Sequence, residues 1–430
     1  MQDYLTEVWG LSLTRAAATV SIWIGLSLVL QPLFHFFACS FLGHLKMLVI
    51  SSSAYTLGII SLYLSTPPVL ANPCKNYEPE CVGKTQKALL YTGMVLMAVG
   101  AAGQRVSLAP LLEAQYTNEN ENEKIGLKRL IGFLMLVFAA IGALVLPLVK
   151  DWSLMFGIPA IITGIATIFF FTGLCCSRYI SPLPDQDQIY YLPKIFTVRM
   201  TLMWTTFITY GMVSSLGRTY FVDQAKHLDQ PKHLGKWKAP TQVLLLAQIW
   251  LAKLLYYVIR KLFRASTEIF MAKLFGVLCC ITAAIMERKR LGIVRSHGLV
   301  DKPDQDIPMS VYWLFFQFIF LGCMDRLFEA SVDGFIENKP RKERGIPDAL
   351  TKCLEIYSQG AYGLGYMCSV LLVFVVGKIS EKGDKPSWFQ STSNRSHLDH
   401  YYWVLAVLSG TSLVMFSVWG MYQRCFRPRH

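Results

Sequence analysis

The chain has 430 residues, of which 53% are apolar, 13% aromatic and only 16% charged, and its formal net charge is +13. Soluble domains usually contain about 25% charged residues, and the apolar residues here fall into runs longer than a soluble core requires. The composition therefore argues against a soluble enzyme, a disordered chain and a disulfide scaffold, and it favours a multi-pass membrane protein. The basic residues lie mostly in short loops between apolar runs, so their expected neighbours are bilayer headgroups and not nucleic acid.

Eleven apolar runs are long enough to cross a bilayer, because a spanning helix needs about 20 mostly apolar residues. The runs are rich in Leu, Ala, Met and Gly and lack strict alternation, which favours helices over the strands of a membrane barrel. The sequence thus predicts an all-α polytopic membrane protein. In chain order the predicted spans are 16–42, 47–66, 88–112, 130–149, 154–176, 196–222, 241–259, 267–286, 309–333, 354–377 and 401–423.

One polar stretch, residues 178–195, contains three prolines and separates five predicted spans from six. Proline-rich polar segments are typical of connections between packed units. We therefore expect an N-terminal helical bundle at 1–177, a linker at 178–195 and a C-terminal helical bundle at 196–430.

The positive-inside rule does not orient the chain, because the basic residues of the loops divide almost evenly between the two sides of the membrane. Arg290 is counted among these loop residues. Two other features fall on one side. Cys74 and Cys81 share a loop and can pair in an oxidising compartment, or remain free thiols. Asn394 begins the sequon Asn-Arg-Ser and can carry a glycan, or lie too close to the membrane for modification. Together they predict that this side is extracellular or lumenal.

Several basic residues lie inside predicted spans, where a charge is costly unless it meets a partner or a polar cavity. Arg105 is preceded by the small residues AVGAAG, which leave space beside a long side chain. It is a candidate for a pathway-facing charge, the alternative being an arginine that reaches the interface. Four others are expected to extend to the headgroups from their helices: Arg199, Arg218, Lys253 and Lys273.

Acidic residues end the ninth predicted span, in which Asp325, Glu329 and Asp333 recur every four residues and so share a helical face. A carboxylate in a low-dielectric cavity can take up and release protons near neutral pH, which is the chemistry of proton coupling. The alternative is a helix that has already left the membrane. We expect Asp325 to face a cavity and Asp333 to be solvated, and both interpretations stay open for Glu329.

No pattern of an enzyme appears in the sequence. It contains no Gly-rich phosphate loop, no HExxH motif and no nucleophile elbow. Apart from Cys74 and Cys81, the cysteines have no His or Cys partners at zinc spacing. We therefore expect no enzymatic activity, no bound metal and no cofactor.

Nine segments along almost the whole chain match, in order, the segments of a known protein family. They are YLTEVWGLSLTRAAATVSIW, FLGHLKMLVISS, STPPVL, PECVGKTQKALLYTGM, WSLMFGIPA, KWKAPTQVLLL, ERKRLGIVRSHGLVD, IPMSVYWLFFQFIFLG and GDKPSWFQSTSNRSHLDHYYWVLAVLS. By these segments the chain resembles the plant nitrate/peptide transporter family, the plant branch of the proton-dependent oligopeptide transporters in the major facilitator superfamily. The resemblance implies two six-helix bundles that rock about a central site. It also places the loops of Cys74, Cys81 and Asn394 on the non-cytosolic side.

The sequence also departs from the family pattern. YLTEVWG resembles the end of the family's first helix, so we expect about 11 of the usual 12 helices, without that helix or its ExxER proton-coupling motif. The resemblance aligns Arg105 with a lysine of the family's fourth helix and Asp325 with a glutamate of its tenth. Gln104 and Tyr210 are further candidates for lining the site, although each can equally be an ordinary buried polar residue.

Two functional hypotheses follow from the residues and the resemblance. The first is a secondary transporter that moves a small polar or anionic solute with protons, the solute being nitrate, a small peptide or another organic solute. Arg105 would attract an anionic group, and Asp325 would carry the proton or answer a cationic group. The second is a transporter-derived chain without active transport: an isoform, an incomplete gene model or a partner-binding subunit. Either protein would reside in the plasma membrane or an internal membrane such as that of the vacuole, and the sequence leaves the oligomeric state open.

Overall fold

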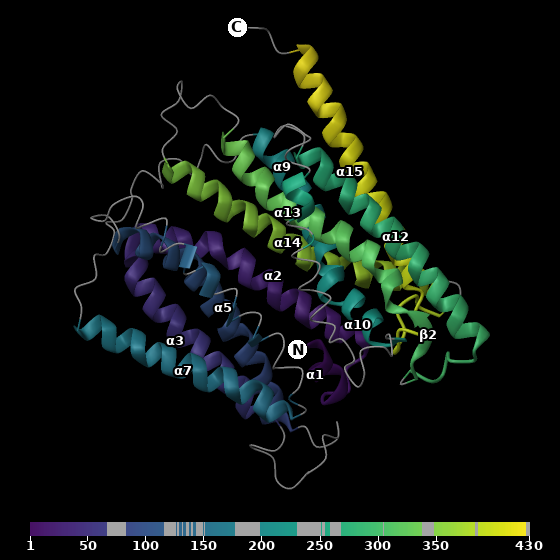
Figure 1. The fold of residues 1–430 in the computed structure, drawn as a ribbon, viewed down its shortest axis with the longest axis horizontal. Helices are drawn as coiled ribbons and strands as arrows, with labels where there is room; N and C mark the ends of the chain where they lie inside the picture. Colours follow the sequence, from purple (N-terminus) through teal and green to yellow (C-terminus); the bar gives the residue numbers. More distant parts are fainter. Residues whose placement is uncertain are drawn as a thin grey trace.

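In the computed structural model, described residues are 1–66, 83–115, 151–176, 198–229, 268–303, 305–337, 348–382 and 386–426, with short pieces within 126–149 and 251–258. They form long helices that lie side by side (Figure 1). The first half contains α1 (Gln2–Glu7), α2 (Leu13–Phe37), the π-helical turn η1 (Ala38–Leu42), α3 (Gly43–Leu64), α5 (Lys84–Gln115) and α7 (Trp152–Cys176). The second half contains α9 (Val198–Arg218), α10 (Tyr220–Lys226), α12 (Glu268–Ser296), the 3-10 turn η6 (Val311–Leu314), α13 (Phe315–Glu337), α14 (Asp348–Ser380) and α15 (Leu398–Phe426).

Seven helical stretches among the described residues are long and apolar enough to cross a membrane, which confirms an all-α polytopic membrane protein. The first stretch, Leu13–Leu64, has 52 residues. A straight helix of that length would measure about 78 Å, far more than the roughly 30 Å of a bilayer core. Gly43, whose φ is 73°, separates α2 from α3 and gives the two spans expected there.

Three of the predicted spans are not among these seven stretches. Helix α9 forms within the predicted span 196–222, but it is less apolar than the seven stretches that could cross a membrane. The predicted spans 130–149 and 241–259 lie, apart from short pieces, outside the described residues, as does the expected linker at 178–195.

Each half of the chain has its own set of packed helices. In the first half α5 packs against α2 and α3, and α7 packs against α3. In the second half α12 packs against α13 and α15, while α9 packs against α14. Helix α2 also packs along α14, and this is the most extensive contact between the two halves in the described part of the chain (Figure 1). An ion pair between Asp3 and Lys226 adds a link from α1 to α10.

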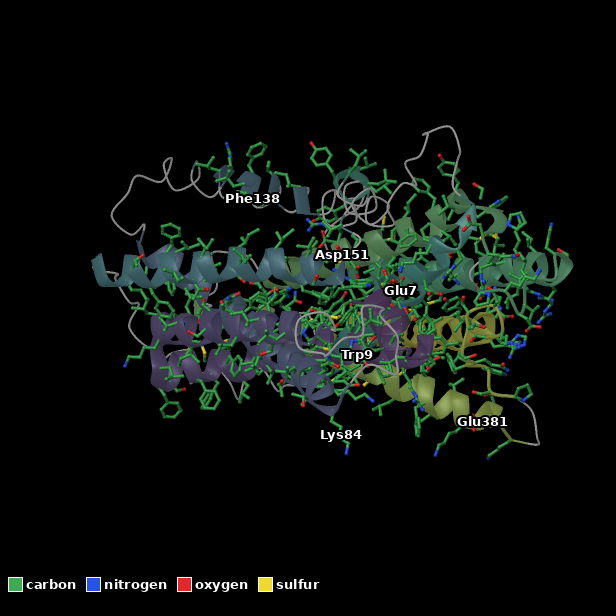
Figure 2. All side chains as sticks on the ribbon, turned by 90° about the horizontal axis from the view of Figure 1, so that it is seen from below. Glu7, Trp9, Lys84, Phe138, Asp151 and Glu381 are labelled. Carbon is green, nitrogen blue, oxygen red and sulfur yellow. The ribbon has the colours of Figure 1, made fainter. Side chains whose placement is uncertain are left out.

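The outer faces of the helices carry large apolar side chains. On α7, Ile161 is 64% exposed and Phe169 is 72% exposed. Exposure of so much apolar surface to water would be unfavourable, whereas contact of this surface with lipid tails is favourable. Figure 2 shows the charged residues Lys84 and Glu381 at the margin of the molecule, whereas Trp9 is buried.

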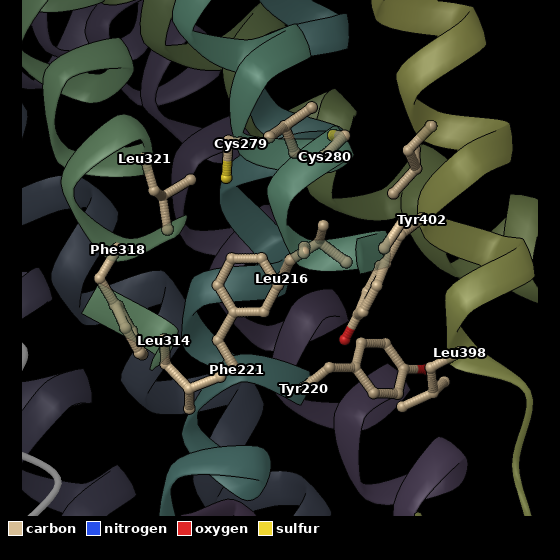
Figure 3. Close-up of a cluster of buried hydrophobic side chains, with 14 of the residues drawn as sticks. Leu216, Tyr220, Phe221, Cys279, Cys280, Leu314, Phe318, Leu321, Leu398 and Tyr402 are labelled. Carbon is tan, nitrogen blue, oxygen red and sulfur yellow. The ribbon is translucent and has the colours of Figure 1, made fainter. Parts of the chain in front are cut away.

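The main core lies in the second half, around Phe221. The ring of Phe221 meets the rings of Phe318 and Tyr402 edge to face, at centroid distances of 5.8 and 5.7 Å, an arrangement that aromatic pairs prefer. Figure 3 shows these rings together with Leu216 and Cys279. Next to this core, the short strand β1 (Leu228–Asp229) pairs in parallel with β2 (Ile307–Ser310). The hydropathy pattern does not predict this two-stranded sheet.

Candidate functional site

Glycines bring α9 and α14 into backbone contact and so position the site. A Cβ atom at Gly211 would lie 2.0 Å from the carbonyl oxygen of Tyr362, and one at Gly365 would lie 2.2 Å from that of Ile208. Only glycine permits so close an approach of two helices. As a result Ser214, which follows Gly211 by about one turn of α9, lies next to the tyrosines of α14.

Asp325 of α13 is the centre of a polar cluster that joins three helices. Its Oδ1 accepts a hydrogen bond from the Tyr362 hydroxyl at 3.0 Å, and its Oδ2 accepts one from Ser214 at 3.2 Å. The Tyr366 hydroxyl in turn donates to Ser214 at 3.2 Å. Asp325 is half-buried. The carboxylate is thus held by neutral hydroxyl groups, which can support both its charged and its protonated form.

Two arginines from opposite halves of the chain extend the cluster, one beside the carboxylate and the other beside the first arginine. Arg218, at the end of α9, interacts with Tyr366 and is close enough to Asp325 for their charges to attract. Arg105 of α5 is close enough to Arg218 for the two like charges to repel. Both arginines are exposed. Because Glu329 is paired with Arg326, the two arginines face one unpaired carboxylate, Asp325, and this local excess of positive charge favours an anionic ligand.

The other predicted site residues lie outside this cluster of hydrogen bonds. Gln104 is half-buried and its Nε2 donates to Ser52 Oγ of α3 at 3.4 Å. Glu329 is exposed and pairs with Arg326 on its own helix, so its charge already has a partner. Tyr210 is 2% exposed, and its hydroxyl donates to the carbonyl oxygen of Ile269 at 2.9 Å. These contacts give Gln104 and Tyr210 partners of their own. Of the predicted set, Glu329 lies close enough to Asp325 for their like charges to repel, and Arg105 is linked to Asp325 only through Arg218.

A second polar network lies inside the second half. Glu287 and Arg290, neighbours on α12, form a two-pronged ion pair with hydrogen bonds of 2.8 and 2.7 Å, and their side chains are 0% and 2% exposed. Gln224 of α10 donates to Glu287 at 2.6 Å. Arg290 also donates to Asn394 Oδ1 at 2.8 Å. The expectation that Arg290 is a loop residue is therefore wrong, because internal partners satisfy its charge inside a helix.

Asn394 is part of that network, and this geometry does not fit the expected glycan. The residue is 6% exposed, its Oδ1 accepts from Arg290, and its Nδ2, the atom that would carry the sugar, donates to the carbonyl oxygen of Leu299 at 3.0 Å. The structure thus argues for Asn394 as a packing residue. The expected disulfide partners, Cys74 and Cys81, lie outside the described residues.

We expect the folded protein to carry no glycan at Asn394, because glycosylation would remove a hydrogen bond from a buried network. The mass of Asn394 peptides, measured with and without glycosidase after expression in eukaryotic membranes, should be identical. A glycosidase-sensitive mass shift that disappears in Ser396→Ala would contradict this prediction.

Lys273 of α12 also differs from its expected placement. It does not extend to the headgroups: it is 3% exposed, and its ammonium donates to the Ser412 carbonyl oxygen at 3.0 Å and to the Ser412 hydroxyl on α15. The ring of Phe416 lies 5.3 Å from the ammonium. Lys273 therefore joins α12 to α15 within the membrane-spanning region. Lys253 lies outside the described residues.

Comparison with known proteins shows which families and folds this chain is similar to. A family model described as the POT family matches residues 45–240. Protein NRT1/PTR FAMILY 5.5 of Arabidopsis thaliana is 25% identical, and the alignment covers 96% of this chain and 91% of the relative. Protein NRT1/PTR FAMILY 5.12 of the same plant is also 25% identical, over 96% of this chain and 86% of the relative.

Solved structures share the fold. An auto-inhibited POT family peptide transporter superposes with a TM-score of 0.66 at 16% identity, covering 100% of this chain and 94% of that chain. The nucleoside transporter NupG superposes with a TM-score of 0.61 at 12% identity, covering 97% of this chain and 93% of that chain. At such identities the likeness establishes the fold alone, and one fold serves transporters named for different solutes.

Proposed function

We propose that this chain, which contains a POT family domain over residues 45–240 and has NRT1/PTR relatives along 96% of its length, is a proton-coupled transporter of the nitrate/peptide class. Its solute is a small polar or anionic molecule such as nitrate, a small peptide or another organic solute. The observation that carries the proposal is the polar cluster in which Arg218 of the second half lies near Asp325 of the same half and near Arg105 of the first half. In this family context, such a cluster between helices is a place for solute and proton to meet.

The charges of the cluster give a route to coupling. Arg218 attracts Asp325 while Asp325 is ionised, and an anionic solute must compete with that carboxylate. Protonation of Asp325 removes the competitor, so Arg218 and Arg105 become free to hold the anionic group of the solute. Proton binding and solute binding then favour each other, and by linkage each raises the affinity for the other. Ser214 and Tyr362 keep the protonated carboxyl hydrogen-bonded.

Alternating access would use the two bundles, 1–177 and 196–430, with the linker at 178–195 between them. The extensive contact of α2 with α14 crosses from one bundle to the other. Rocking about such a contact would open the Arg105–Asp325 region first to one side of the membrane and then to the other. In this proposal Arg105 and Arg218 separate and approach as the bundles move, because they belong to different halves.

The test is uptake by the full-length chain reconstituted into vesicles with an inward proton gradient. Labelled nitrate and a labelled dipeptide serve as probes. Asp325→Asn should reduce proton-driven uptake to background, because the amide cannot bind and release the coupling proton. Arg105→Ala should raise the half-saturating solute concentration about 10- to 100-fold, the effect of losing one charge-assisted hydrogen bond of about 1.5–3 kcal/mol.

Asp301→Asn is the matched control, because Asp301 is an exposed carboxylate that pairs with Arg395 outside the cluster. It should transport like the unmodified chain. Unchanged proton-driven uptake in both Asp325→Asn and Arg105→Ala would reject the site. Absence of uptake of either probe by the correctly inserted, unmodified chain would favour the rival hypothesis of a chain without active transport.

A further inference from the structure

Three side chains with metal-binding atoms meet where α15 begins. One ligand atom each from His397, Asp399 and His400 lies within 4.8 Å of the other two, and no other such group occurs in the described part of the chain. His397 immediately precedes α15, and the other two residues lie in its first turn. This group is separate from the cluster around Asp325 and has no role in the function proposed above.

The fold holds the backbone of His397 and the ring of His400 in place. The backbone nitrogen of His397 donates to the carbonyl oxygen of Trp388 at 2.8 Å. The ring of His400 stacks on the ring of Trp388, with a centroid distance of 4.8 Å and an interplanar angle of 30°. The two imidazole centroids are 5.6 Å apart. Side chains fixed by contacts of this kind lose little freedom when they take up a ligand.

An independent observation comes from the carboxylate of Asp399, the third member of the group. Asp399 is 9% exposed, and its Oδ1 has no hydrogen-bond donor among the described residues. The Nδ1 atom of His397 lies 3.8 Å from this oxygen, which is too long for a hydrogen bond. A buried carboxylate oxygen without a partner is costly, and a cation seated between Asp399 and the two histidines would supply one.

The sequence predicts no bound metal, but from this geometry we propose that His397, Asp399 and His400 bind a divalent transition metal ion of the zinc class. Two imidazoles and one carboxylate suit zinc, which takes three protein ligands at about 2.0–2.2 Å and leaves a fourth position for water. Magnesium and calcium prefer shells made of oxygen atoms. His400 is exposed, so the ion can enter from the solvent. The bound ion would fasten the segment that contains Trp388 and His397 to the first turn of α15.

The test is zinc binding to the full-length chain, purified in detergent with a tag that contains no histidine. Competition with a chromophoric zinc indicator gives stoichiometry and affinity, and the thermal unfolding temperature gives a second readout. We expect one zinc ion per chain and a rise in unfolding temperature with zinc but not with magnesium, because a ligand that binds the folded state stabilises it.

Two variants remove ligands with little change in shape. His400→Phe keeps an aromatic ring on Trp388 but lacks the nitrogen, and Asp399→Asn keeps the size of the side chain. Each should weaken zinc binding about tenfold or more. His297→Phe, which removes an exposed histidine on another loop, should bind zinc like the unmodified chain. Equal zinc affinity in the unmodified chain and both ligand variants would overturn the proposal, as would an unfolding temperature that zinc does not raise.

Discussion

Glu287→Gln is expected to lower the free energy of unfolding by about 3–5 kcal/mol, the usual cost of removing one partner of a buried ion pair. Glu287 accepts two hydrogen bonds from Arg290 and one from Gln224, and all three side chains are almost fully buried. A glutamine amide supplies one oxygen acceptor where the carboxylate supplied two. The guanidinium of Arg290 would therefore stay inside the protein without its hydrogen-bonded countercharge, and Asp223 would be the acidic group that remains near it.

The measurement is unfolding of the purified chain in mixed micelles of increasing denaturing-detergent content. The double variant Glu287→Gln with Arg290→Met should recover much of the loss, because it removes the unpaired charge together with its partner. Asp301→Asn breaks an ion pair of which both members are at least half exposed, and it should change stability by less than about 1 kcal/mol. If Glu287→Gln unfolds at the same denaturant content as Asp301→Asn, the network does not hold this part of the fold.

Apolar runs predict helices well in this chain, and they predict helix ends less well. The prediction 154–176 matches α7 (Trp152–Cys176) closely, because every residue of that helix is compatible with lipid. The prediction 267–286 ends ten residues before α12 does. The charges of Glu287 and Arg290 lower the local hydropathy, so the pattern predicts that the span ends before them. In the structure these two residues form an ion pair inside the helix bundle. A pattern along the sequence contains no information about such pairing.

The same limit applies to the candidate site. Asp325 stands out in the sequence because it is an acid within an apolar run. Arg218 does not stand out, because an arginine at a helix end is ordinarily explained by contact with headgroups. Only the tertiary contact of α9 with α14 places it beside Tyr366 and Asp325. For Lys273 the local pattern suggests extension to the interface, and the deciding partner, Ser412, is far away along the chain.

Gly365→Val is expected to lower the free energy of unfolding by at least about 3 kcal/mol, at the upper end of what overpacking usually costs. Its Cβ would lie 2.2 Å from the Ile208 carbonyl oxygen and 2.7 Å from the Cα of Gly211. Both neighbours are backbone atoms, which cannot rotate away as a side chain would, so α9 and α14 must separate. That separation also moves Ser214 away from Tyr366, and the cluster around Asp325 loses its support.

The measurement combines the yield of monodisperse protein with its thermal unfolding temperature, and Gly410→Val is the matched control. A Cβ at Gly410 meets nothing within 4 Å, so valine there adds volume without a clash and slightly favours the helix over glycine. A normal unfolding temperature in Gly365→Val would contradict the close helix contact. If Gly365→Val instead folds at reduced stability, its proton-driven uptake should fall further than its folded yield, because the displaced helices carry Ser214 and Tyr362.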